Sequence, residues 1–122
     1  MEAFTIKKVS TGYKFDLFAA NGERIASSEV YSSEAACRKG IQSVRLFAPS
    51  AGIEEQWEEG YARLSNPKFE AYRDKSGAYR FRLRARNGKI IAVSDSYTAK
   101  ASCLDGIESV RKNAACLSNE RP

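Results

Sequence analysis

One segment of this chain occurs twice. Residues 13–45 align without gaps with residues 79–111, and 17 of the 33 aligned positions are identical. The similarity extends upstream to Phe4 and Phe69, with the first copy one residue shorter near its first turn. The whole chain has 122 residues, which is the length of one ordinary domain. The two copies are therefore expected to build one domain together.

Each copy begins with a pattern typical of β-strands. Extended pieces at 4–9 and 69–73 lead into glycine-containing turns. Beyond the first turn, Phe15 and Leu17 alternate with polar residues such as Lys14, which is the period of a half-buried strand. The second copy repeats this alternation. Each copy thus starts with two strands joined by a tight turn.

A second turn and a helix complete each copy. The Asn-Gly pairs at 21–22 and 87–88 predict type I′ hairpin turns, because both central residues of that turn need positive φ. A third strand follows, and then Ser32 or Thr98 is expected to cap the N-terminus of a helix. The unit is therefore β-β-β-α, present twice.

The predicted helix carries one apolar stripe and a central glycine. Cys37, Ile41 and Val44 fall on one face, as do their counterparts in the second copy. Gly40 and Gly106 occupy matching sites in mid-helix, where glycine costs up to about 1 kcal/mol relative to alanine. Their presence predicts a close approach of each helix to the sheet or to the other helix.

The two units are expected to pair about a pseudo-twofold axis, because a unit of about 45 residues buries little apolar surface alone. The fold class is α+β, with one antiparallel sheet and the helices packed on one of its faces. Residues 1–47 form the first repeat, residues 48–68 an inter-repeat strand or linker, and residues 69–122 the second repeat with a short tail. Together they make one compact domain.

The inter-repeat segment allows several structures. Ile53, Trp57, Tyr61 and Leu64 have helical spacing, which indicates an amphipathic helix among the glutamates of this region. A short strand near Ile53 and a flexible linker are the alternatives. The pattern alone does not choose among them.

The repeated motifs resemble those of the YegP-like family. They are YRFRLRARNG at 79–88, the Ile-Ala pair and serine of the third strand, the following tyrosine, and CLDGIESVR at 103–111. The first repeat departs from the basic pattern at Asp16 and Phe18. Members are bacterial and archaeal proteins of uncharacterised function with one or two repeats.

The resemblance implies a fold but no chemistry. It implies a single antiparallel sheet of two β-β-β-α-β units, with the last strand of each unit exchanged onto the other. One-repeat members of this family achieve the same arrangement as homodimers. The resemblance favours a short strand at 51–55 with a linker from Trp57 onward. It transfers no catalytic residue.

Composition argues against catalysis and against a metal site. The chain has no histidine, which is the commonest general base and metal ligand. Its three cysteines are widely spaced, which fits a reducing cytosol and makes no tetrahedral metal set. Cys37 and Cys103 are expected in the core, whereas Cys116 is expected to be exposed. We therefore expect no enzyme, no cofactor and no metal.

The basic residues are unevenly placed. Residues 1–62 hold 7 Lys and Arg and 9 Asp and Glu, whereas residues 63–122 hold 13 and 6. Alternate residues of one strand are arginines and should project from one face. The candidate polyanion-binding residues are this row and its flanks: Arg80, Arg82, Arg84, Arg86, Arg73 and Lys89. The alternative is a solvated outer face neutralised by acids such as Glu70 or Asp95.

The sequence is compatible with two candidate functions. The first is a non-enzymatic protein-interaction or assembly module acting through sheet edges, with a protein partner. The second is binding of nucleic acid or another polyanion at the arginine row. No apolar run approaches the roughly 20 residues of a membrane span, and no signal peptide is evident. A cytoplasmic protein is expected, as a monomer with an internal pseudo-dimer or as a weak homodimer.

Overall fold

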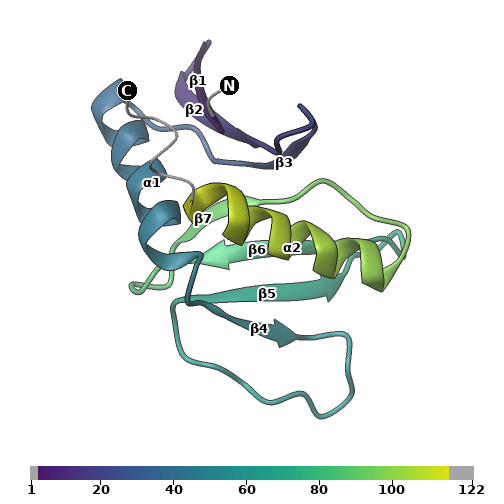
Figure 1. Cartoon of the computed structure of the whole chain (residues 1–122). Coiled ribbons are helices and arrows are strands. Elements are labelled where there is room, and N and C mark those ends of the chain that lie inside the picture. Colours follow the sequence, from purple (N-terminus) through teal and green to yellow (C-terminus); the bar gives the residue numbers. More distant parts are fainter. Residues whose placement is uncertain (1–2, 116–122) are drawn as a thin grey trace.

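The fold is α+β, with one seven-stranded sheet and two helices (Figure 1). The computed structural model describes residues 3–115. The first repeat forms β1 (Phe4–Val9), β2 (Gly12–Phe18), β3 (Arg24–Ser27) and α1 (Glu34–Phe47). There follow β4 (Gly52–Glu55) and then the second repeat, with β5 (Lys68–Arg73), β6 (Tyr79–Arg84), β7 (Ile90–Val93) and α2 (Lys100–Ala115).

The sheet is mixed but mostly antiparallel, so the prediction of one antiparallel sheet is correct except at β4. Its order is β1-β2-β3-β7-β6-β5-β4, and β4 pairs with β5 in the parallel direction. The other pairings are antiparallel. Strand β4 follows α1 along the chain yet lies at the edge of the second repeat. The long connection at 56–67 lets the chain return to the start of the sheet and run parallel to β4 as β5, which local hydrophobic patterns do not reveal.

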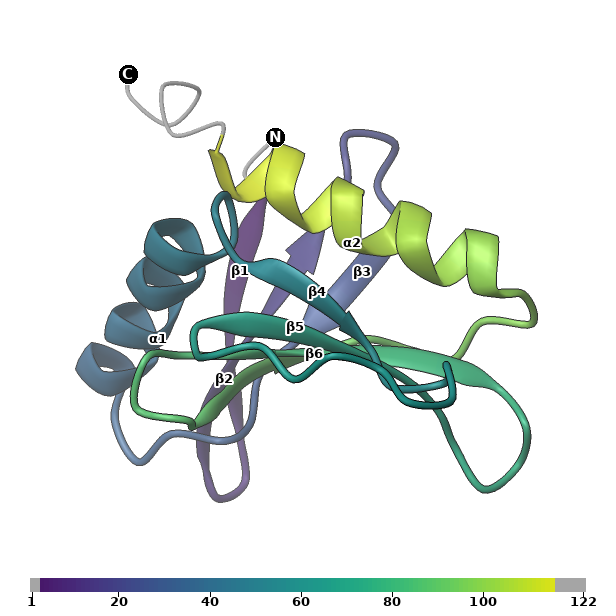
Figure 2. The same ribbon diagram turned by 90° about the horizontal axis from the view of Figure 1, so that it is seen from below.

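The two repeats meet at the centre of the sheet and share one core. Strands β3 and β7 are joined through Ser27 and Val93. Helix α1 also contacts β7, and α2 also contacts β2 and β3, so each helix packs on both repeats. Figure 2 shows β1 and β2 running at a steep angle to β5 and β6, as expected for a strongly twisted sheet. Neither repeat buries its apolar face alone.

The core follows the predicted alternation. Phe15 and Leu17 are fully buried, as are Phe81 and Leu83 at the matching positions. The helix stripes face these strands and include Cys37 and Cys103, both with no exposed surface. The expectation that these two cysteines pack in the core is confirmed. Cys116 lies outside the described residues.

The hairpin turns differ from the predicted type I′. Gly22 and Gly88 have positive φ, at 89° and 87°, but among the described residues no residue other than glycine has one. Asn21 and Asn87 therefore do not adopt the conformation that a type I′ turn requires. The register also shifts just before each turn, at Leu17/Phe18 in the first repeat. One left-handed glycine with a register shift is the usual signature of a type I turn followed by a bulge.

The first helix begins one residue later than predicted. Ser33, not Ser32, caps α1, and its side chain accepts a hydrogen bond from the Ala36 amide at 3.1 Å. Helix α2 begins at Lys100, so Thr98 does not directly precede it. Adjacent serines offer the same cap chemistry, and the backbone path decides between them.

The inter-repeat segment is a strand followed by a loop. The short strand near Ile53 is confirmed as β4, whereas the helical interpretation of residues 53–64 was wrong. Trp57 packs edge-on against Tyr79, with ring centroids 5.5 Å apart, and its indole N–H donates to Glu55. Of the apolar residues spaced like a helix, Ile53 and Trp57 pack against the core, whereas Leu64 is exposed.

An exchange of final strands by both repeats remains a prediction. Strand β4 pairs with the second repeat. The corresponding segment after α2 aligns with β4 at residues 118–121 and lies outside the described residues.

Candidate functional site

The arginine row of β6 is paired with carboxylates of its own sheet. The Nε of Arg82 and the Nε of Arg84 lie 2.6 and 2.8 Å from the same oxygen of Glu70 on β5. Arg80 donates to Asp74 at 2.7 Å, in the turn between β5 and β6. The cross-strand register of β5 and β6 places Glu70 opposite Arg82. Each of these three arginines is therefore ion-paired within the protein, although two carboxylates serve all three.

The acids of this face are held ionised. Burial raises the pKa of Glu70, but the hydrogen bonds and charges of Arg82 and Arg84 outweigh it and lower that pKa below its ordinary value. Hydrogen bonds from Ser76 and Arg80 lower the pKa of Asp74 strongly. Both carboxylates stay negative at neutral pH and each offsets part of the positive charge that a polyanion would bind.

The other candidate residues do not join the row in one cluster. Arg73 lies over the Tyr79 ring at 5.4 Å and donates to the Gly77 carbonyl. Arg86 lies over the Phe47 ring of α1 at 5.8 Å. Lys89 is exposed beyond the β6–β7 turn. The predicted set thus divides into three ion-paired arginines and three separate cations.

A buried ion pair closes the same outer face next to β4. Glu54 is 2% exposed and accepts hydrogen bonds of 2.7 Å from the Lys68 ammonium, the Gln56 amide and the Leu64 backbone amide. Lys68 also lies 3.5 Å from Glu70. Burial alone would raise the pKa of Glu54, but these hydrogen bonds and the Lys68 charge lower it to about 2. This ion pair holds the loop after β4 against the sheet.

Acid is expected to destabilise the fold through Glu54. Its pKa in the folded protein is about 2, below the ordinary value of 4.5, so ionised Glu54 stabilises the fold above pH about 4.5. That stabilisation should be lost progressively as the pH falls from about 4.5 towards 2. Urea denaturation across this range checks it: Glu54→Gln should flatten the pH dependence, and an unchanged slope would refute the depressed pKa.

Neither buried cysteine is suited to nucleophilic catalysis. Burial raises the pKa of Cys103 to about 11 and also raises that of Cys37, so both stay protonated at neutral pH. Among residues 3–115, no three Cys, Asp or Glu side chains lie close enough to hold a metal ion. No helix in that range is long and apolar enough to cross a membrane.

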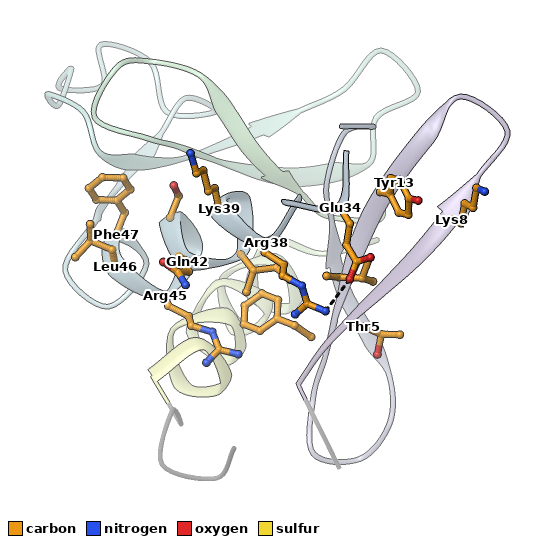
Figure 3. Close-up of a pocket in the computed structure, with 14 residues that line it drawn as sticks. Thr5, Lys8, Tyr13, Glu34, Arg38, Lys39, Gln42, Arg45, Leu46 and Phe47 are labelled. Carbon is orange, nitrogen blue, oxygen red and sulfur yellow. Dashed lines mark hydrogen bonds and ion pairs between the residues drawn. The ribbon is translucent and has the colours of Figure 1, made fainter. Parts of the chain in front are cut away.

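A groove between β1 and α1 is the feature that sequence reasoning missed. It has a volume of about 1330 Å³ and is lined by side chains of both elements, which Figure 3 shows around the opening. We call it the edge groove. Its apolar lining includes Phe4, Ile6, Ile41, Leu46 and Phe47, and its charged lining comprises Lys8, Arg38, Lys39, Arg45 and Glu34.

The charged positions of the edge groove differ between the two repeats. Four basic residues and one acid line it. The repeat alignment replaces Arg38 and Lys39 of α1 by Leu104 and Asp105 in α2, and it also replaces Glu34 by Lys100. This difference between two otherwise similar helices was the available signal in the sequence. The sequence difference does not reveal a groove, because the groove depends on which strand each helix covers.

The comparisons with known proteins agree with the fold. A family model described as a domain of unknown function, DUF1508, matches residues 9–55 and 74–116. The UPF0339 protein YegP of Yersinia pestis is 40% identical over 111 residues, covering 90% of this chain and 86% of the relative. A shorter UPF0339 protein of Treponema denticola is 66% identical over 47 residues, covering 38% of this chain and 81% of that relative.

Two solved structures have the same fold. The solution structure of YegP from Escherichia coli superposes with a TM-score of 0.73 at 34% identity, covering 93% of this chain and 88% of that one. A UPF0339 protein of Shewanella oneidensis gives 0.75 at 29% identity, covering 92% and 83%. The two segments of this chain that match DUF1508, together with the relatives that cover most of its length, show that it belongs to the UPF0339/YegP family. It is a member with two DUF1508 repeats.

Proposed function

We propose that this chain is a non-enzymatic protein-interaction module that takes up an extended segment of another protein as an additional strand beside β1. The observation that carries this proposal is the unequal covering of the two sheet edges. Strand β5 is covered by β4, whereas among the described residues no strand pairs with the outer side of β1. A strand edge of this kind is a template for strand addition.

The backbone of β1 presents hydrogen-bonding groups to such a segment. The Phe18 amide donates to the Ala3 carbonyl, so residue 3 bonds inward to β2. Because bonding alternates along an antiparallel strand, the backbone groups of Phe4, Ile6 and Lys8 face outward. The second repeat shows what such groups do: Ala71, the counterpart of Ile6, accepts from the Gln56 amide at 2.7 Å beside β4.

The side chains around this edge favour an acidic partner. The edge groove offers apolar surface from Phe4 and Ile6 together with the charges of Lys8, Arg38 and Lys39. A second copy aligned edge to edge would bring its own lysines towards this lysine-bearing strand, which like-charge repulsion disfavours. Charge complementarity therefore favours an acidic segment of a different protein.

The exchange of final strands predicted from the family resemblance would bring residues 118–121 to the same edge. This segment reads Ser-Asn-Glu-Arg, where β4 reads Gly-Ile-Glu-Glu. It lacks the apolar residue of β4 and carries no net charge. Lys68, which binds Glu54, is replaced by Ala3 in the first repeat. If residues 118–121 occupied the edge of β1, they would bind it more weakly than β4 binds β5. An acidic segment of another protein could then compete with them for this edge.

Nuclear magnetic resonance with peptides selected from a random library tests the proposal. Selected peptides should shift the amide resonances of β1 and α1 and leave those of α2 unchanged. The variant Arg38→Glu/Lys39→Glu should reduce this binding. Lys75→Glu/Lys89→Glu, with the same change in net charge at exposed sites of the second repeat, should retain it. Shifts confined to other surfaces would refute strand addition at β1.

Polyanion binding at the arginine row is the second candidate, and the ion pairs of Glu70 and Asp74 argue against it. We expect Arg82→Ser/Arg84→Ser to leave binding of single-stranded DNA, RNA and heparin unchanged at every salt concentration. The measurement is a salt titration of fluorescence anisotropy. A loss of binding in this variant, with retention in Lys8→Ser/Lys39→Ser, would place a polyanion site on β6 after all.

A further inference from the structure

We infer that Asn21, in the turn between β2 and β3, is a site of spontaneous deamidation to aspartate and isoaspartate, and that Asn87 in the matching turn is protected. This inference is independent of the proposed strand addition at β1. Both asparagines are exposed and both precede a glycine. Because glycine has no side chain, its backbone nitrogen is unhindered, and both turns carry the same reactive pair. The structure distinguishes them.

Deamidation at an Asn-Gly pair passes through a cyclic imide. Hydroxide removes the proton of the Gly22 amide, and the nitrogen bonds to Cγ of Asn21. The side-chain amide takes a proton from water and leaves as ammonia. Water then adds to one of the two imide carbonyls and breaks its bond to the nitrogen. Cleavage at Cγ gives aspartate, whereas cleavage at the former backbone carbonyl gives isoaspartate, so water is the only co-reactant.

The folded turn opposes the first step in both repeats. The Gly22 amide donates to the Ala19 carbonyl at 2.9 Å, and the second repeat has the same bond. Each asparagine side chain also accepts from the amide two residues later, at 2.9 and 3.0 Å. The glycine nitrogen must leave its carbonyl partner before it can attack Cγ. Reaction in either turn therefore requires local opening of that turn.

One side chain restrains the second turn but not the first. Nη1 of Arg84 donates to the Gly88 carbonyl at 2.7 Å, and Nε of the same residue is held by Glu70 at 2.8 Å. Phe18 has the matching position in the first repeat and cannot donate. In the described part of the chain, no side chain donates to the Gly22 carbonyl. Opening of the second turn must therefore break an additional bond from a charged donor.

Peptide mapping by mass spectrometry measures both reactions in one sample. The folded chain is incubated in mildly alkaline buffer, and aspartate and isoaspartate are quantified at each asparagine over time. We expect Asn21 to react at least about fivefold faster than Asn87, because a hydrogen bond from a charged group is stronger than a neutral one. Asn66 should not react, because the following Pro67 has no amide proton.

Two variants and a denatured sample test the cause of this difference. Arg84→Met removes the donor to the second turn and should raise the rate at Asn87 by about fivefold. Arg82→Met removes a comparable ion pair with Glu70 but no bond to the turn, so it should leave that rate unchanged. In urea the restraints of the fold are absent, and both asparagines should react at similar rates.

Several results would overturn the inference. Equal rates in the folded chain, or faster reaction at Asn87, would show that Arg84 does not protect its turn. A difference that persists in urea would assign it to the flanking residues rather than to the fold. Deamidation without isoaspartate would exclude the cyclic imide. An unreacted Asn21 in the folded chain, after complete reaction in urea, would show that the first turn is protected as well.

Discussion

Replacement of Lys68 by methionine is expected to lower the free energy of unfolding by about 3–5 kcal/mol. Lys68 is the only cation within 4 Å of the Glu54 carboxylate among the described ion pairs, at 2.7 Å, and both side chains are buried. The substitution keeps most of the side-chain volume but leaves a buried negative charge without a counter-ion. Urea denaturation at pH 7 measures the loss.

Two further variants identify the cause of this loss. Glu54→Gln/Lys68→Met removes both charges and should be closer to the wild type than Lys68→Met alone. Arg38→Met breaks an ion pair whose side chains are 65% and 52% exposed, and it should change stability by less than about 1 kcal/mol. A double variant as unstable as the single one would show that lost packing, rather than the uncompensated charge, is responsible.

Replacement of Gly106 by alanine is expected to destabilise the protein by about 1–3 kcal/mol, although alanine favours helices over glycine by about 1 kcal/mol. An added Cβ would overlap the hydroxyl oxygen of Tyr97 and lie 2.8 Å from the ring carbon that bears it. It would also lie 3.0 Å from the buried ring of Phe81. The two rings are stacked 6.3 Å apart, so neither moves alone. Thermal and urea denaturation report the difference.

The internal repeat provides a replicate of this experiment. Gly40 meets Tyr31 and Phe15 in the same arrangement, so Gly40→Ala should have a similar effect. The added variant Tyr97→Phe removes the overlapping oxygen and should reduce the cost of Gly106→Ala. Ser102→Ala, at an exposed site of α2, should change stability by less than about 0.5 kcal/mol. Stabilisation by Gly106→Ala would contradict the close packing described for this helix.

The parts of the fold that sequence predicts well are those governed by local periodicity. Alternation around Phe15 and Phe81 locates the central strands, and the helix stripes correctly place Cys37 and Cys103 in the core. The central glycines indicate a close approach to the sheet, which Phe15 and Phe81 bear out, and each glycine also meets a tyrosine from the segment before its helix. In each case the residue and its neighbours along the chain carry the whole signal.

The parts that were wrong or missed depend on contacts between distant segments. The helical spacing after Ile53 does not produce a helix, and Trp57 instead holds a loop against Tyr79. The pairing of Arg82 and Arg84 with one glutamate depends on the register of β5 against β6. Sequence analysis named Glu70 as a possible neutralising acid, yet it could not show that one carboxylate accepts from both arginines.

The sequence by itself determined that two copies of one small unit must share a core. Each copy has the same apolar periodicity, and a single copy buries too little apolar surface to fold alone. Only the tertiary structure decided which edge of the sheet each segment covers. It shows β4 on the second repeat and, within residues 3–115, no strand on the outer side of β1. Backbone hydrogen bonds to a sheet edge are independent of side-chain identity, and the side-chain contacts that hold β4 there, such as Glu54 with Lys68, join residues far apart in the sequence.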